Sequence, residues 1–390
     1  MSSDEGSLVY DSSSHEGDPD EEFEANLQRI RENDPQMTKL DADGNFEYEQ
    51  NMTDEEWEQF GRDISNNTHL QTVGVVDNAL NDHKASFFFR GLTRSSSIET
   101  IFLYDNDLSV AGVRSMVPFL QNAHSLTNLN LDRNNLQSEG FNVIFRALTD
   151  SPIERLYCDN CCITTIEIDT GHIPRNLSRL NLPRNGITAD GCRELAKLLQ
   201  GEDATLRELD LDHNEIDDTG VGLLVNALRN NMSLTLLSLT GNNRISKQGK
   251  IMLLKLVNDV SSIKATLQSN HTLQSISVDP PDERDDQIQR YIRMATMINL
   301  SEAGRMKVIQ TQLNSKRRAK LAKLQGVNSS VFSEINPLHL PEVLALVGRH
   351  HGQGELFVAL RSSIAGVISA VDKKQSLKEQ SAYYRARIAE

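Results

Sequence analysis

The chain has 390 residues and a formal net charge of −15 at pH 7. Because a nucleic-acid-binding surface needs clustered positive charge, this acidic balance predicts a protein partner and no nucleic acid. Three of the four cysteines lie between residues 158 and 162, which is not the disulfide framework typical of small secreted proteins.

The sequence also lacks the marks of secretion and of membrane insertion. Its N-terminus is acidic and serine-rich, where a signal peptide would be basic and then apolar. The longest apolar stretch, residues 356–371, is interrupted by Arg361 and is too short to span a bilayer. We therefore expect an intracellular protein without membrane contact, cytoplasmic or, as the alternative, nuclear.

The first predicted segment, residues 1–36, carries eleven acidic residues against Arg29 and Arg31 and has few large apolar side chains. Such a composition cannot bury enough surface to offset the entropy lost on ordering, so we expect a disordered acidic tail. Phe23, Leu27 and Ile30 are spaced to form one short amphipathic turn on a partner, which is the alternative.

Residues 37–69 are expected to form an N-terminal capping repeat. Thr53 and Glu56 have the spacing of a capping box at the start of a helix, and Trp57, Phe60 and Ile64 follow at helical spacing. We expect the single Trp to cover the core of the first repeat. The segment before this helix fits a degenerate repeat at Met37, Leu40, Ala42 and Asn45.

Residues 70–281 repeat one apolar skeleton, L-x-x-L-x-L-x-x-N-x-L. The first three copies begin 28 residues apart, and the match loosens from Leu234 to its end near Pro280. The L-x-L alternation predicts a short strand with one buried face, and stretches such as residues 189–200 predict a helix with an apolar stripe. The clearest copies are Leu70, Val73, Val75, Asn78 and Leu80; Ile98, Ile101, Leu103, Asn106 and Leu108; Leu126, Leu129, Leu131, Asn134 and Leu136; Leu177, Leu180, Leu182, Asn185 and Ile187; and Leu206, Leu209, Leu211, Asn214 and Ile216.

This pattern resembles the leucine-rich repeat family, and the period with helical second halves is similar to its ribonuclease-inhibitor type, over residues 37–279. The resemblance implies an α/β leucine-rich repeat solenoid, a curved horseshoe with parallel strands inside and helices outside. We expect each repeat to supply one strand and one helix, because a single unit cannot bury both of its apolar faces.

The cysteine cluster is interpreted within this skeleton. Cys158 takes the third apolar strand position, and Cys161 takes the position of the repeat Asn. Both are expected to point inward, whereas Cys162 lies beyond the strand and within reach of oxidants. A zinc site needs four converging ligands, so we expect the cluster to be structural and to bind no metal.

Residues 282–390 are expected to form a helical C-terminal extension. Apolar residues recur at helical spacing within residues 285–300, 340–348 and 355–371. The basic stretch at residues 315–323 is expected to be a solvated helix face, with a nuclear import signal or a site for an acidic partner as the alternatives.

Motifs for catalysis or cofactor binding are missing from the sequence. The stretch from Asp41 begins like a calcium-binding loop, but Phe46 stands where the turn needs Gly and Met52 where a bidentate Glu is needed. His350 and His351 lack a third ligand nearby in sequence. There is no phosphate-binding glycine loop and no G-x-S-x-G motif. We expect no enzyme, no metal and no cofactor.

We expect the functional surface to be the concave strand face, toward which the residues between the buried strand positions point. Tyr and Arg are enriched at binding hot spots, so the aromatic patch from Phe102 to Tyr157 is the candidate anchor. The candidate partner-binding residues are Phe102, Tyr104, Asn130, Asp132, Arg133, Tyr157, Asp159, Asn181, Arg184, Asp210, Asp212 and His213.

Two functions from different classes are compatible with this sequence. The first is a monomeric, non-enzymatic scaffold that binds a protein partner on the concave face, as the resemblance implies. The alternative is a GTPase regulator resembling the Ran GTPase-activating protein, which uses similar repeats. In that family an acidic stretch follows the repeats, whereas here the acidic run is N-terminal and no functional arginine can be matched.

Overall fold

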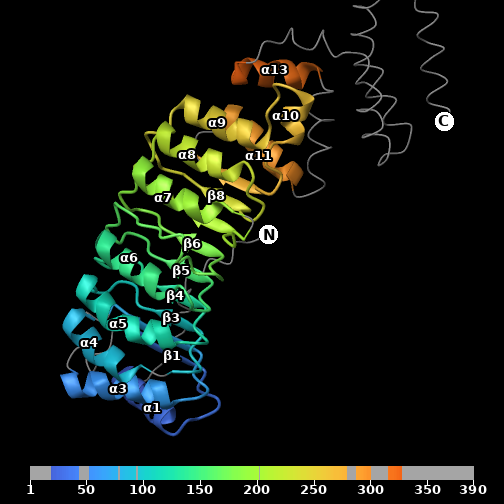
Figure 1. Cartoon of the computed structure of the whole chain (residues 1–390). Coiled ribbons are helices and arrows are strands. Elements are labelled where there is room, and N and C mark those ends of the chain that lie inside the picture. Colours follow the sequence, from blue (N-terminus) through green and yellow to red (C-terminus); the bar gives the residue numbers. More distant parts are fainter. Residues whose placement is uncertain are drawn as a thin grey trace, which may run out of the picture. The chain divides into compact units, whose positions relative to one another are not determined.

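The computed structural model describes residues 19–43, 52–77, 80–93, 95–201, 203–278, 287–299 and 315–326. The chain divides into two compact units, Met1–Ile153 (unit 1) and Glu154–Glu390 (unit 2). In each unit, short parallel strands line one side and helices line the other (Figure 1). None of the described helices combines the length and the apolar character needed to cross a membrane.

Unit 1 has strands that pair in parallel in chain order, as expected for the repeats. The described strands are β1 (Lys39–Asp43), β2 (Thr72–Val76), β3 (Thr100–Phe102) and β4 (Asn128–Asn130). The described helices are α1 (Pro19–Arg31), α3 (Asp54–Asn66), α4 (Asp82–Gly91), α5 (Val110–Asn122) and α6 (Gln137–Ala147).

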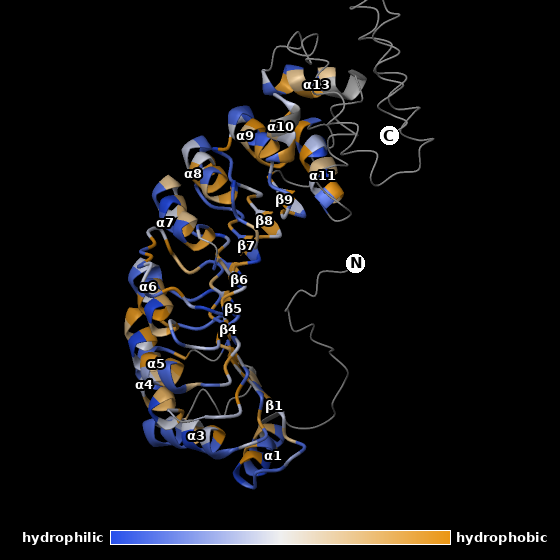
Figure 2. Ribbon diagram, turned by 45° about the vertical axis from the view of Figure 1, so that its right-hand side comes forward, coloured by the Kyte–Doolittle hydropathy of each residue, from blue (hydrophilic) through white to orange (hydrophobic). Residues whose placement is uncertain are grey.

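Unit 2 has the same parallel order from β5 to β9. The described strands are β5 (Arg155–Tyr157), β6 (Arg179–Asn181), β7 (Glu208–Asp210), β8 (Leu236–Ser238) and β9 (Ser275–Ser277). The described helices are α7 (Ala189–Leu199), α8 (Asp218–Leu228), α9 (Lys247–Val257), α10 (Ile263–Leu267), α11 (Gln287–Asn299) and α13 (Ser315–Gln325). Helices such as α7 and α8 carry polar and apolar residues together, which is typical of helices with one face on a core (Figure 2).

The apolar skeleton forms the core, as its spacing predicts. In β4 the central Leu129 is fully buried, and in β6 the same is true of Leu180. The flanking Leu126 and Leu131 are also fully buried. The fold is therefore an α/β leucine-rich repeat solenoid in both units.

The repeat Asn joins adjacent repeats within each unit. Asn214 accepts a hydrogen bond from the backbone N–H of Ile187 (3.1 Å) and donates one to the carbonyl of Leu182 (2.9 Å), both in the preceding repeat. In unit 1, Asn106 accepts in the same way from the N–H of Leu80 (3.0 Å). These bonds satisfy buried backbone groups that have lost their hydrogen bonds to water.

The residue before this Asn has a left-handed backbone conformation in successive repeats. Its φ lies between +49° at Arg184 and +75° at Gly241. The positions are Asp77, Asp105, Arg133, Asn160, Arg184, His213 and Gly241. Few residues other than Gly, Asn and Asp adopt this conformation readily. Here it follows the strand, and wherever the next residue is described, that residue is a buried Asn or Cys.

The N-terminal part of unit 1 differs in part from the expected disordered tail. Residues 19–31 form α1, in which Phe23, Leu27 and Ile30 are buried. The Phe23 ring lies 5.9 Å from that of Phe60 in α3. The three apolar residues thus cover α3, whose own start has the expected capping box with Thr53. Residues 1–18 lie outside the described residues.

The repeat that begins at Ile153 lacks the expected helix. Residues 158–178 contain no helical segment, and the next skeleton begins only 24 residues later, at Leu177. Ile168 is buried where a helix would otherwise pack; its N–H donates to Glu194 of α7 (3.0 Å) and its carbonyl accepts from Lys197 (3.1 Å). A shorter repeat therefore closes its core with extended chain.

The described part of the C-terminal extension is helical, as expected. α11 packs against β9 and α9, and its Gln289 donates to the carbonyl of Ile276 (2.9 Å). Gln325 at the end of α13 donates to the carbonyl of Asn258 (2.7 Å). Residues 300–314 and 327–390, which include His350 and His351, lie outside the described residues, as does most of the calcium-loop-like stretch.

Candidate functional site on the strand face

We define the strand face as the side of each unit's sheet that is turned away from the helices. The three residues of β3, β5, β6 and β7 follow one burial pattern, in which the central residue is buried and its two neighbours are half-exposed. Successive side chains of a strand point to opposite faces. The half-exposed residues of each strand therefore share the strand face.

In unit 1 the strand face carries an aromatic pair. The rings of Phe102 and Tyr104 meet edge to face, with centroids 6.3 Å apart. Tyr104 follows the end of β3, and both side chains are half-exposed. Next to them, Arg133 forms an ion pair with Asp105 (2.6 Å). This part of the face therefore combines apolar area with charge, as binding surfaces commonly do.

In unit 2 the strand face carries a row of polar side chains that contact one another across β5, β6 and β7. Arg179 of β6 donates to the Tyr157 hydroxyl (3.3 Å) and pairs with Glu208 of β7 (2.6 Å). All three side chains are half-exposed. The strand register places Arg179 directly beside Glu208, so opposite charges meet across neighbouring strands.

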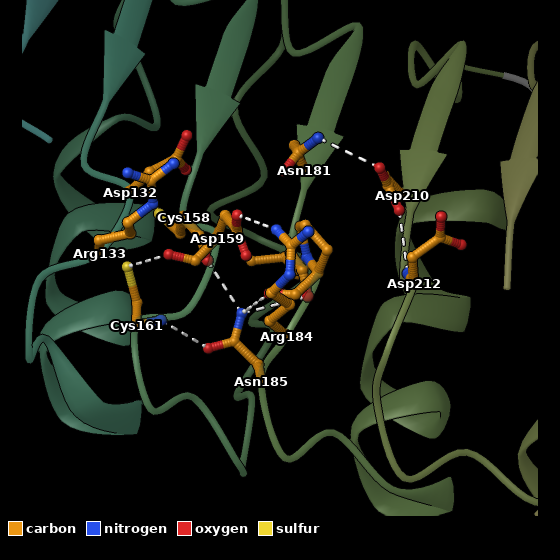
Figure 3. Close-up of polar contacts among 12 residues, drawn as sticks. Asp132, Arg133, Cys158, Asp159, Cys161, Asn181, Arg184, Asn185, Asp210 and Asp212 are labelled. Carbon is orange, nitrogen blue, oxygen red and sulfur yellow. Dashed lines mark hydrogen bonds and ion pairs between the residues drawn. The ribbon is translucent and has the colours of Figure 1, made fainter. Parts of the chain in front are cut away.

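Three carboxylates and one guanidinium lie at the strand ends of unit 2 (Figure 3). Arg184 pairs with Asp159 at 2.6 Å. Asn181 donates to one carboxylate oxygen of Asp210 (3.3 Å), and the N–H of Asp212 donates to the other (2.9 Å). Asp212 in turn accepts from a backbone N–H in the next repeat. The carboxylates are thus held in place by hydrogen bonds within unit 2.

The pKa of Asp210 is raised to about 6, mainly by burial. Repulsion by the nearby carboxylates Asp212 and Asp159 contributes to this increase, while the hydrogen bond from the Asp212 N–H and the charge of Arg184 act in the opposite direction. Near neutral pH the surface therefore holds a negative charge that the protein only partly compensates.

His213 lies against the next repeat. A Cβ at Gly241 would come within 2.3 Å of the His213 Nδ1, so the absence of a side chain there makes room for the imidazole. Gly241 itself has φ +75°, which L side chains rarely adopt. His213 is exposed and directly follows Asp212 in the chain.

The predicted site residues differ in how far their side chains are exposed. Asn130 and Asp159 are each only 8% exposed, so they offer little contact area and instead hold Asp132 and Arg184 in place. The half-exposed residues are Phe102, Tyr104, Asp132, Tyr157, Asn181, Asp210 and Asp212, and Arg133, Arg184 and His213 are exposed. Phe102 and Tyr104 belong to unit 1 and Tyr157 to unit 2.

Sequence reasoning missed Arg179 and Glu208. Both precede the central strand leucine by one residue, whereas the prediction considered only residues after it. The signal was present, because in a strand the residues before and after a buried position share a face.

The cysteines occupy the positions expected from the skeleton. Cys158 and Cys161 are fully buried, and Cys162 is exposed with φ +59°. Cys161 replaces the repeat Asn: its thiol donates to the Asp159 carbonyl (3.3 Å), and its N–H donates to Asn185 of the next repeat (3.0 Å). The cluster is part of the repeat framework at the base of the candidate site (Figure 3).

Comparison with known proteins gives the following similarities. A family model described as Leucine Rich repeat matches residues 174–196 and 202–225. Ribonuclease inhibitor from Mus musculus is 27% identical over 49% of this chain and 43% of its own length, and the Sus scrofa protein has the same values. NACHT, LRR and PYD domains-containing protein 5 from Mus musculus is 30% identical over 46% of this chain and 16% of its own.

Among solved structures, leiomodin-1 actin-binding site 2 matches 35% of this chain and 78% of its own at 20% identity and a TM-score of 0.30. The chain thus spans less than half the length of the ribonuclease inhibitors that it matches. The repeat skeleton, the parallel strands and the sequence similarities to the Leucine Rich repeat model and to ribonuclease inhibitors agree. The chain is a leucine-rich repeat protein of the ribonuclease-inhibitor-like type.

Proposed function

We propose that the chain is a non-enzymatic scaffold that binds a protein partner on its strand face. Ribonuclease inhibitors, by their name, act on another protein, and the chain is similar to them over 49% of its length. Repeat solenoids present extended surfaces that suit such binding. This similarity supports a protein-binding role, and the chemistry of the strand face supports its location.

The observation that carries the proposal is the fixed carboxylate group around Asp210. Ionising a carboxyl whose pKa is raised lowers the stability of the folded protein at neutral pH. A surface without a function would gain stability by replacing it with a neutral residue. A cationic side chain of a partner would compensate the charge, so the presence of this carboxylate favours a binding role.

The aromatic pair supplies the second part of the surface. Phe102 and Tyr104 bury much area on contact and lose little side-chain entropy, which is why aromatic residues dominate interface energies. We propose that they anchor a partner through unit 1, while Tyr157 and the carboxylates act in unit 2. Asn130 and Asp159 contribute by positioning their neighbours.

Affinity capture with the intact chain, followed by calorimetry with the purified partner, tests the proposal. Changing Phe102 and Tyr104 to Ala should weaken binding at least about tenfold while the unfolding midpoint stays unchanged. The matched control is Arg114→Ala, which removes an exposed charge on helix α5. If the control weakens binding as much as the aromatic variant, or if only deletion of residues 282–390 abolishes it, the strand face is not the site.

A further inference from the structure

A groove of about 790 Å³ lies in unit 2 at the edge of the sheet where the strands begin. Its lining includes Glu154 just before β5, Ser178 just before β6, Arg207 just before β7 and Thr235 just before β8. The carboxylates of the candidate site end or follow their strands, at the opposite edge of the sheet. The groove is therefore a separate surface.

Two guanidinium groups dominate the chemistry of this groove. Arg175 and Arg207 are exposed, and within the described part of the chain neither is joined to a carboxylate. By contrast, Arg179, Arg184 and Arg193 of the same unit each have an ion-pair partner. The exposed carboxylate of Glu154 also lines the groove and offsets one of these charges, so the groove keeps a net positive charge in a protein with a net charge of −15.

Two of the hydroxyl groups in the groove donate to backbone carbonyls. Ser178 donates to the carbonyl of Glu154 (3.2 Å), and Thr235 donates to the carbonyl of Arg207 (3.0 Å). They fix the loops that form the wall. The N–H donors of the two arginines remain for a ligand, and guanidinium pairs with carboxylates through two parallel hydrogen bonds.

An apolar contact lies in the same groove. Met232 also lines it and is 87% exposed, which is unusual for a large apolar side chain in the described part of this protein. Methionine is flexible and polarisable, so it adapts to different apolar partners. The groove thus offers two guanidinium groups, one carboxylate at Glu154 and one adaptable apolar contact.

The extent of the groove indicates the shape of its ligand. Adjacent strands are about 4.8 Å apart, so the starts of β5 to β8 span roughly 15 Å, the length of about four or five extended residues. We propose that this groove binds an extended acidic segment of a partner protein, with carboxylates on Arg175 and Arg207 and an apolar side chain on Met232.

Fluorescence anisotropy with the full chain tests the proposal. The probe is a fluorescein-labelled peptide of about eight residues that alternates glutamate and leucine, long enough for the span above. The matched probe has glutamine in place of each glutamate. The acidic probe should bind at least about tenfold more tightly, and its affinity should fall with added salt because charge attraction is screened.

Variants locate the binding. Arg175→Ala with Arg207→Ala should weaken binding of the acidic probe at least about tenfold, and Met232→Ala should weaken binding of both probes. Arg229→Ala is the matched control, since Arg229 is exposed in unit 2 and does not line the groove. It should bind as the parent chain does, as should the strand-face variant Asp210→Asn.

Four outcomes would overturn the proposal. The first three are equal affinity for the acidic and neutral probes, parent-like affinity of the double arginine variant, and no detectable binding of the acidic probe. Loss of affinity in Asp210→Asn instead of the groove variants would also overturn it, because binding would then be at the strand face. Circular dichroism of each variant identifies any loss that comes from unfolding.

Discussion

Asp210 links the charge of the strand face to protein stability. Its pKa is about 6 in the folded protein, compared with 3.8 for a free side chain, mainly because of burial. Above pH 6 the ionised carboxylate therefore lowers stability. Between pH 6 and 4 the folded protein binds the proton before the unfolded chain does, so lowering the pH in this window favours folding through this group.

Asp210→Asn should raise the free energy of unfolding at pH 7.5. We expect a gain of about 1–2 kcal/mol, less than the full shift implies, because the amide keeps only one of the two accepted hydrogen bonds. Near pH 4 the gain should disappear. Urea unfolding at both pH values measures it, with Asp203→Asn in an exposed loop as the control. An equal effect at the two pH values would contradict the assignment.

Individual residues also show the limit of sequence reasoning at the site. The alternation around Leu129 predicts that Asn130 lies on the strand face, but it contains no information on how deeply the side chain is buried. The Asn130 carboxamide bends back to accept from the Asp132 N–H (2.8 Å) and becomes buried. Such local hydrogen bonds depend on the turn that follows the strand, which the repeat pattern does not specify.

At the scale of elements, a carboxylate in the first turn of one helix caps the helix of the next repeat. Asp82, in the first turn of α4, accepts from the N–H groups of Ser109 (2.7 Å) and Gly112 (2.8 Å) at the start of α5. Asp218 of α8 accepts from the Gly249 N–H of α9 in the same way (3.1 Å). Negative charge is favourable at a helix N-terminus. Capping is thus shared between adjacent repeats.

Gly112→Ala should destabilise the protein, although alanine normally favours helices. A Cβ there would lie 2.5 Å from Asp82 Oδ1 and 2.9 Å from the Leu108 side chain, so the capping carboxylate must move. We expect a loss of about 1–3 kcal/mol. The matched control is Gly222→Ala in α8, where the nearest atom is 3.9 Å away. It should stabilise by about 0.5–1 kcal/mol.

Urea unfolding of both variants measures whether each substitution lowers or raises the free energy of unfolding. In an Asp82→Ala background, Gly112→Ala should cost less, because the clashing carboxylate is gone. If Gly112→Ala stabilises the protein as Gly222→Ala does, helix propensity outweighs the shared cap.

At the scale of the whole molecule, the repeat period predicts most of the fold. The described residues of the skeleton from Leu70 to Val278 are buried as expected, and α3 begins with the expected capping box. The period does not predict α1. The composition of this helix is too polar to indicate a folded segment, and the helix is stabilised by contact with α3. Nor does the period predict the missing helix after β5, where a 24-residue spacing leaves too little chain.

The stability effects of one substitution on each side of the sheet distinguish a core residue from a surface residue. Leu129→Ala should lower the free energy of unfolding by about 2–5 kcal/mol, because Leu129 is fully buried. Tyr104→Ala should change it by less than about 1 kcal/mol, since Tyr104 is half-exposed. Hydrogen exchange should show that Leu129→Ala also loosens β3, because repeats are stabilised by their neighbours. Protection lost only in β4 would contradict this coupling.

The left-handed residue before each repeat Asn makes the strand face open to diversification. At these positions the chain already uses Asp, Asn, Arg, His and Gly, which all have positive φ here and differ in charge. β-Branched residues would be strained there. A combinatorial library restricted to unbranched side chains at residues 105, 133, 160, 184 and 213 would therefore vary the charge of the face repeat by repeat. The buried framework below would keep its sequence, so the scaffold could be adapted to new partners without redesigning its core.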